Sequence, residues 1–166
     1  MKRQLSYLMK LASLTFIMAT AMPVFLLAQK GKVNFSGTWT LNEQKSTQPQ
    51  GGGSYQRMGG GTFVLAQEEN LLTRTRTAQD GTTRVSKYTL DGKESVNMTG
   101  RGESKSTVKW SEDGKTLTIV SKFNVDGNER TSSEIWTLAD PGTLSIAVTR
   151  QGQDGEVKST MIYDKK

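Results

Sequence analysis

Residues 104–124 read SKSTVKWSEDGKTLTIVSKFN. Two runs rich in Thr, Val, Leu and Ile flank Asp113-Gly114, and apolar and polar residues alternate along each run. Alternation with a period of two indicates half-buried β-strands. Asp-Gly is typical of a tight hairpin turn, because Gly adopts a positive φ without steric cost and Asp tolerates one. The stretch therefore predicts an antiparallel β-hairpin.

The same pattern recurs along most of the chain. Further turn pairs of Asp-Gly type occur at 80–81, 91–92, 126–127 and 154–155, with Asp-Pro-Gly at 140–142. We expect strands near 35–42, 62–67, 70–78, 82–90, 94–99, 104–111, 115–124, 129–138, 142–151 and 156–163. No segment after residue 30 has helical spacing over a useful length. The sequence therefore predicts an all-β fold.

Aromatic residues return at nearly constant intervals in the C-terminal half. Trp110 and Trp136 are 26 residues apart, and Trp136 and Tyr163 are 27 apart, so each interval spans one hairpin. Sequential hairpins form a meander, and closure of the meander removes its exposed edges. We therefore expect a single antiparallel up-and-down (meander) β-barrel of about 8–10 strands, with a two-sheet sandwich as the alternative. Trp110 and Trp136 are candidates both for the core and for a ligand-binding surface.

Residues 1–28 have the layout of a secretory signal peptide. Three cations precede an apolar run of 18 residues that Pro23 interrupts, and such a run barely spans a bilayer. Cleavage after Ala28 would leave residues 29–166 as one mature domain, and cleavage after Ala21 is the alternative. We therefore expect an exported protein, secreted or periplasmic, with no stable membrane insertion after the signal is removed.

The chain has no histidine and no cysteine. These absences exclude disulfides, zinc sites built on Cys or His, cysteine nucleophiles and any Ser-His-Asp arrangement. Many of the acidic residues lie in predicted turns, and no spacing identifies an acid/base pair. The sequence predicts a non-enzymatic protein without metal or cofactor, and the alternative is an activity based on carboxylates and arginine.

The net charge of +6 is weak evidence for a nucleic-acid partner. Three of the 22 cations lie in the predicted signal peptide, so residues 29–166 carry +3. The remaining Lys and Arg residues are scattered and do not cluster with exposed aromatics, so we expect no nucleic-acid binding. Stretches such as TRTRT at 73–77 also cannot supply the apolar outer band of a membrane barrel.

Arginines on two neighbouring predicted strands are candidate ligand-binding residues. Arg74 and Arg76 share one face of their strand, and Arg84 shares a face with Tyr88 on the next strand. Paired arginines bind carboxylates and phosphates well. The alternative is that they face solvent, because burying unpaired cations is costly. The sparse apolar residues of the domain predict a partly polar barrel interior.

A Gly-rich segment, residues 44–61, separates the first two predicted strands. It contains three consecutive glycines twice, on either side of Ser54-Tyr55-Gln56-Arg57-Met58. Its composition predicts a flexible loop. The alternative is a lid over the barrel mouth in which Tyr55, Arg57 and Met58 contact a ligand. No Gly-Lys-Ser/Thr follows, so the segment does not match a phosphate-binding loop.

The first predicted strand carries Phe35-Ser36-Gly37-Thr38-Trp39-Thr40-Leu41. It resembles the Gly-x-Trp strand of the lipocalin and fatty-acid-binding-protein (calycin) superfamily. With LDGKE at 90–94 and KWSEDGKTLTI at 109–119, the chain is also similar to small lipocalin-like proteins that bacteria export. The resemblance implies that Gly37 and Trp39 take part in barrel closure, with a cation from a late strand, here Arg150, stacked on the Trp39 ring. Fatty-acid-binding proteins have a helical lid where this chain has the Gly-rich segment.

Size, fold and the resemblance together predict an exported, non-enzymatic binding protein. Its barrel would hold a small amphipathic or hydrophobic ligand. The alternative is a protein-interaction or inhibitor module of the cell envelope whose barrel is filled by side chains.

Overall fold

The computed structural model describes residues 31–47, 61–78, 81–100, 102–125, 127–152 and 155–166. The predicted signal peptide, Tyr55, Arg57 and Met58 lie outside these ranges. These described ranges contain ten strands, and the bounds of each lie within two residues of those predicted. They are β1 (Gly37–Asn42), β2 (Thr62–Gln67), β3 (Leu71–Thr77), β4 (Thr83–Thr89), β5 (Ser95–Thr99), β6 (Gly102–Trp110), β7 (Thr116–Val125), β8 (Asn128–Asp140), β9 (Thr143–Gly152) and β10 (Gly155–Lys165). Within the described ranges, no helix is long and apolar enough to cross a membrane.

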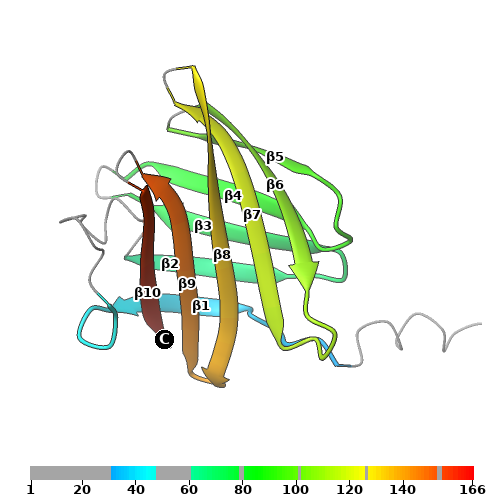
Figure 1. Cartoon of the computed structure of the whole chain (residues 1–166). Coiled ribbons are helices and arrows are strands. Elements are labelled where there is room, and N and C mark those ends of the chain that lie inside the picture. The colour runs from blue at the N-terminus through cyan, green and yellow to red at the C-terminus, as the bar shows by residue number, and fades with distance from the viewer. Residues whose placement is uncertain (1–30, 48–60, 79–80, 101, 126, 153–154) are drawn as a thin grey trace, which may run out of the picture. The chain divides into compact units, whose positions relative to one another are not determined.

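The strands form one antiparallel sheet that curls into a nearly closed barrel. Its order is β4-β3-β2-β1-β10-β9-β8-β7-β6-β5, so β1 pairs with β10 and the other paired strands are neighbours in the sequence. Figure 1 shows β1 to β4 crossing behind β7 to β10 at a steep angle. The predicted up-and-down barrel is confirmed, and the two-sheet sandwich is not the fold.

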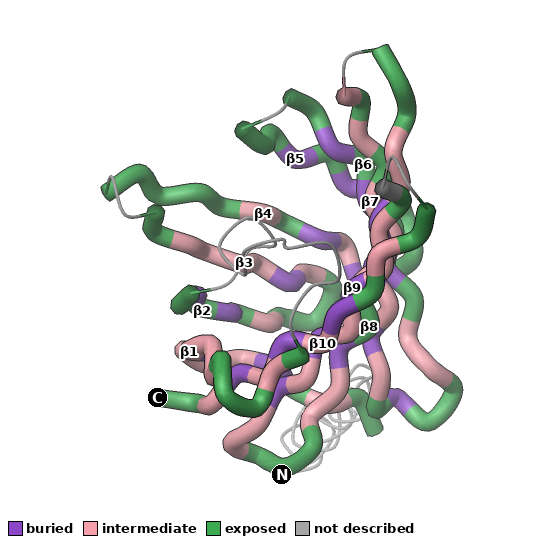
Figure 2. The backbone as a smooth tube through the Cα atoms, turned by 60° about the vertical axis from the view of Figure 1, so that its left-hand side comes forward, coloured by how far each residue is buried: buried purple, intermediate pink, exposed green. Residues whose placement is uncertain are grey.

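β4 and β5 are the two ends of the sheet (Figure 2). Side-chain hydrogen bonds join them across the seam. The Lys87 N–H donates to Asn97 Oδ1 at 2.7 Å, and Asn97 Nδ2 donates to the Lys87 carbonyl at 2.9 Å. Nearer the turn that joins the two strands, the Thr89 N–H donates to Ser95 Oγ at 2.8 Å. The Asn97 amide therefore takes the place of a backbone ladder pair and satisfies an edge that would otherwise be open.

Large aromatic side chains fill one end of the barrel. Phe35, Trp39 and Trp136 are fully buried there. The Phe35 ring stacks on Trp110 at 5.9 Å and meets Trp136 edge-on at 6.0 Å. Trp39 Nε1 donates to the Phe35 carbonyl at 2.9 Å, which satisfies the polar atom of a buried indole. This end is a packed floor.

The cation over Trp39 is Lys165, and the assignment of Arg150 from the resemblance is wrong. Lys165 Nζ lies 5.3 Å from the Trp39 ring centroid. The β1–β10 register pairs Trp39 directly with Lys165, whereas Arg150 pairs with Val157 near the other end of β10. Gly37 makes room for this contact, because a Cβ at its φ of 148° would lie 2.5 Å from Lys165 Cε.

Inward side chains change from apolar to polar along the barrel. The register of β6 to β9 aligns them in rows of four, starting at the floor: Trp110, Leu117, Trp136 and Ile146, then Val108, Ile119, Glu134 and Val148, then Ser106, Ser121, Ser132 and Arg150. Serine is too small to fill the space that valine or leucine would occupy. The packed core therefore gives way to open space above the second row.

Candidate functional site

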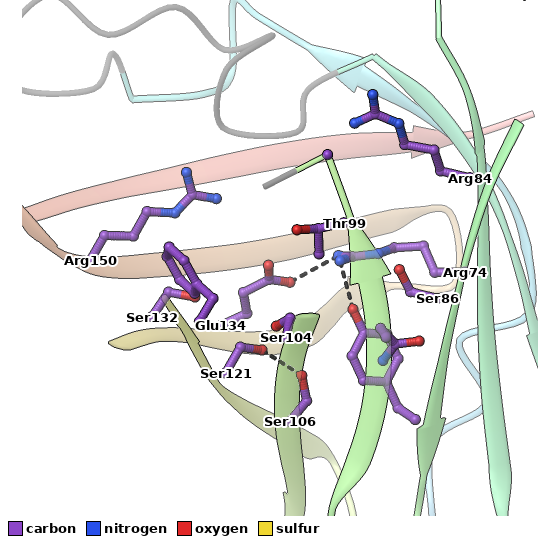
Figure 3. Close-up of a pocket in the computed structure, with 14 residues that line it drawn as sticks. Arg74, Arg84, Ser86, Thr99, Ser104, Ser106, Ser121, Ser132, Glu134 and Arg150 are labelled. Carbon is purple, nitrogen blue, oxygen red and sulfur yellow. Dashed lines mark hydrogen bonds and ion pairs between the residues drawn. The ribbon is translucent and has the colours of Figure 1, made fainter. Parts of the chain in front are cut away.

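A cavity of about 400 Å³ occupies the polar half of the barrel (Figure 3). Its volume lies within the range typical of small-molecule sites. The lining comprises Arg74, Arg84, Glu134 and Arg150, the hydroxyls of Ser86, Thr99, Ser104, Ser106, Ser121 and Ser132, and Tyr88, Asn97, Gly100 and Phe123. Side chains therefore do not fill the interior. The alternative function, an interaction or inhibitor module, assumed a filled barrel.

Serine hydroxyls form one wall of the cavity. Ser106 and Ser121 lie 2.8 Å apart, oxygen to oxygen, and bond to each other. The side-chain hydroxyls of Ser86, Ser104 and Ser132 make no hydrogen bond to another residue in the described part of the chain, although each lines the cavity. These three hydroxyls can each donate one hydrogen bond and accept others.

An ion pair crosses the barrel beneath this wall. Arg74 Nη1 donates to Glu134 Oε2 at 3.0 Å, with side chains only 14% and 17% exposed. Arg74 Nη2 donates to the Tyr88 hydroxyl at 2.8 Å, and Trp136 Nε1 donates to the same Glu134 oxygen at 3.0 Å. The Arg74 guanidinium also lies over the Tyr88 and Trp136 rings, at 5.5 and 5.6 Å. The pair joins β3 to β8.

The neighbouring charges keep both partners ionised. Burial alone would raise the pKa of Glu134, but Arg74, Arg76 and the Trp136 hydrogen bond outweigh it and hold that pKa below its ordinary value. Burial opposes the charge of Arg74 as well, yet Tyr88 and Glu134 hold the pKa of Arg74 above its ordinary value.

Among the described residues, positive charge is in excess around the cavity. Three arginines and one carboxylate line it, a net charge of +2 for the described lining. A further arginine, Arg76, follows Arg74 on the inward face of β3, with its guanidinium carbon 5.0 Å from the Phe63 ring centroid. Burial, together with repulsion from Arg74, lowers the pKa of Arg76 to about 10. Glu134 alone cannot neutralise this group of cations.

Arg84 lies at the rim, beside the upper end of the seam. It is exposed, and its guanidinium is close enough to Gly100 that a Cβ there would lie 3.2 Å from Nη1. Arg84 thus reaches from β4 to the residue that follows β5, and its charge faces the mouth of the cavity (Figure 3).

Three of the residues predicted from the sequence meet in this cavity: Arg74, Arg84 and Tyr88. Arg76 lies next to them, and Trp136 lies below as the indole that bonds Glu134. The alternative placement of Arg74 and Arg76 on the solvent face is wrong, because both side chains point into the barrel.

Trp110 does not line the cavity. It lies at the packed end, stacked on Phe35, with Lys32 Nζ 5.4 Å from its ring centroid. Trp110 was a candidate both for the core and for a ligand-binding surface, and the structure places it in the core. The prediction for Tyr55 and Arg57 concerns residues outside the described ranges.

Sequence reasoning missed Glu134, the serine wall and the position of Arg150. The alternating pattern of the strands contains a signal that could have identified them. Each of β6 to β9 has apolar inward residues toward the floor and Ser, Glu or Arg at the next inward positions, as in Ser132-x-Glu134-x-Trp136. Within the described residues, no group of three or more His, Cys, Asp or Glu side chains could hold a metal ion.

Two solved structures share this architecture. Zebrafish ileal bile acid-binding protein, solved in complex with cholic acid, superposes with a TM-score of 0.56 at 18% identity, over 80% of this chain and 98% of that one. An abundant heat soluble (SAHS) protein from Ramazzottius varieornatus also superposes with a TM-score of 0.56, at 12% identity, over 80% of this chain and 95% of that one. The likeness shows that this chain shares their β-barrel fold. No protein-family model matches the sequence, and no curated protein sequence matches it.

Proposed function

We propose that this protein is a non-enzymatic binding protein that holds a small molecule with an anionic group inside its barrel. The observation that carries the proposal is the excess of positive charge among the described residues that line the cavity. Three arginines and one carboxylate line a cavity of about 400 Å³. Guanidinium groups bind carboxylates and phosphates through paired hydrogen bonds, and they do so more strongly where water is scarce.

The state of Arg76 supports the same proposal. Arg76 is a buried cation whose pKa is lowered to about 10, so its charge destabilises the folded protein. The single negative charge of Glu134 is shared between Arg74 and Arg76. An anion in the cavity would add a second negative charge and so offset the cost of burying Arg76. The zebrafish bile acid-binding protein, similar in fold, was solved with an organic acid, cholic acid.

Export is part of the proposal and rests on the N-terminal pattern of the sequence. Expression of the full chain in a bacterial host, followed by fractionation and N-terminal sequencing, tests it. We expect the protein outside the cytoplasm with Gln29 as its first residue. Full-length protein in the cytoplasm would contradict export and leave the binding proposal unaffected.

A matched pair of variants tests whether binding occurs in the cavity. Ser132 lines the cavity, whereas its neighbour Ser133 belongs to the outer face of the same strand. Ser132→Phe should fill part of the cavity, and Ser133→Phe adds the same ring outside it. We would titrate each protein with decanoate, gluconate and glucose 6-phosphate by isothermal calorimetry.

We expect at least one of these anions to bind the parent protein with a stoichiometry of one. Ser132→Phe should abolish that binding, and Ser133→Phe should retain it. Absence of binding for all three anions, or equal binding by both variants, would overturn the proposed function.

A further inference from the structure

The described lining of the cavity offers little apolar surface to a ligand. Phe123 and the ring of Tyr88 are its only large apolar groups, and the other described lining side chains are hydroxylated, amidic or charged. An acyl chain or a sterol in this space would strip water from hydroxyls and guanidinium groups without replacing their hydrogen bonds. That loss is costly for each polar group.

The serine wall presents hydroxyls from three neighbouring strands. Ser106, Ser121 and Ser132 are direct cross-strand partners on β6, β7 and β8, whose backbones lie about 4.8 Å apart, so their side chains form one row. Ser104 stands one inward position above Ser106. Such a surface matches a ligand that carries several hydroxyl groups, because each serine both donates and accepts a hydrogen bond.

The arginines border this wall. Arg150 is the cross-strand partner of Ser132, so the serine row ends in a guanidinium group. Arg74 lines the cavity from β3, and Arg84 does so from the rim. A ligand that lies on the serine row therefore has its end among cations.

We propose that the natural ligand is a phosphorylated polyol, of which a sugar phosphate is the simplest kind. Its hydroxyl groups would lie on Ser104, Ser106, Ser121 and Ser132, and its phosphate among Arg74, Arg84 and Arg150. A phosphate monoester carries a charge of about −1.5 to −2 at pH 7, which complements the net charge of +2 of the described lining. This inference rests on the proposed function and narrows its ligand class.

Four probes separate the contribution of the polyol from that of the phosphate: glucose 6-phosphate, n-hexyl phosphate, glucose and inorganic phosphate. Hexyl phosphate keeps the anion and replaces the polyol by an apolar chain. We would measure the affinity of each probe by calorimetry for the parent protein and for Ser132→Phe. A Ser104→Ala/Ser132→Ala variant, which keeps every charge, tests the hydroxyl contacts directly.

We expect glucose 6-phosphate to bind at least tenfold more tightly than hexyl phosphate, glucose or inorganic phosphate. The double alanine variant should weaken glucose 6-phosphate by about three- to tenfold and leave hexyl phosphate unchanged, since each hydrogen bond contributes a modest net amount. Its urea midpoint, measured alongside, separates a lost contact from a damaged fold.

Two outcomes would overturn the inference in different ways. If hexyl phosphate or decanoate binds as tightly as glucose 6-phosphate and Ser132→Phe abolishes that binding, the cavity is a site for apolar anions. The proposed function then stands and the polyol class fails. If no anion binds, or Ser132→Phe changes nothing, both the ligand class and the proposed function fail.

Discussion

Replacement of Glu134 by Gln should destabilise the protein by about 2–3 kcal/mol at pH 7. The substitution keeps an oxygen that accepts from Trp136, but it removes the negative charge that faces Arg74 at 3.0 Å. Breaking a buried ion pair from one side costs about 3–5 kcal/mol. We expect the lower end or slightly less, because the side chains are 14% and 17% exposed toward a cavity that admits solvent.

The pH dependence of this difference has a definite sign. The pKa of Glu134 is lowered in the folded protein from 4.5, so the folded state binds fewer protons than the unfolded state in that range. Its contribution is therefore complete above pH 4.5 and is lost as the pH falls below 4.5 through the folded pKa. The stabilities of the parent and of Glu134→Gln should converge in that acidic window and differ by a constant amount above it.

Urea unfolding followed by tryptophan fluorescence measures the effect, because Trp39 and Trp136 are fully buried. With an m-value of about 1–3 kcal/mol/M, a loss of about 2–3 kcal/mol should lower the midpoint by about 0.7–3 M. Glu129→Gln is the matched control. Glu129 pairs with Lys122 at 3.2 Å, but the two side chains are 65% and 57% exposed, so its loss should cost well under about 1 kcal/mol.

A second variant tests whether the stability lost in Glu134→Gln comes from leaving the Arg74 charge unpaired. Arg74→Met combined with Glu134→Gln removes both charges, so it should be more stable than Glu134→Gln alone. The reasoning is refuted if Glu134→Gln costs no more than Glu129→Gln, or if the double variant is less stable than the single one. Either result would mean that the Arg74 charge is not desolvated in solution.

Four further substitutions test other parts of the barrel. Trp39→Ala should cost about 3–5 kcal/mol in urea unfolding, whereas Lys165→Ala should cost about 1 kcal/mol or less; equal losses would contradict the floor role of Trp39. Asn97→Ala removes two hydrogen bonds across the seam and should cost about 1–3 kcal/mol. Hydrogen exchange at the Lys87 amide should accelerate in that variant, and unchanged exchange would argue against the side-chain closure. Arg76→Met should be neutral or stabilising by about 1 kcal/mol at pH 7, because the substitution removes a buried cation with a lowered pKa. A loss of more than about 1 kcal/mol in Arg76→Met would show that its burial is not costly.

The strands and their turns could be predicted because their signals are local. Alternation with a period of two identifies a strand within a few residues, and Asp-Gly identifies the turn that follows it. The meander follows from these two features, since short turns join only neighbouring antiparallel strands. The absence of His and Cys likewise removes whole classes of site, because those side chains are the ligands and nucleophiles on which such sites depend.

The candidate site was predicted only in part. Arg74, Arg84 and Tyr88 could be grouped because they lie on consecutive strands joined by one hairpin. Glu134 lies 60 residues after Arg74, and nothing in the local pattern connects them. Lys165 and Trp39 meet through pairing of the first strand with the last, a long-range contact that local spacing does not encode.

The sequence by itself therefore determined the strands and their succession along the meander, and its sparse apolar residues indicated a partly polar interior. Only the tertiary structure decided which face of each strand points inward and at what level each side chain lies. The physical reason is that alternation offers two faces, and a shift of one residue in register exchanges them. Where Ser and Thr occupy both faces, as at 131–133 in β8, no difference in polarity selects the inward one. Closure of the barrel through β1 and β10 makes that selection, and it brings the serine row, Glu134 and the arginines around one cavity.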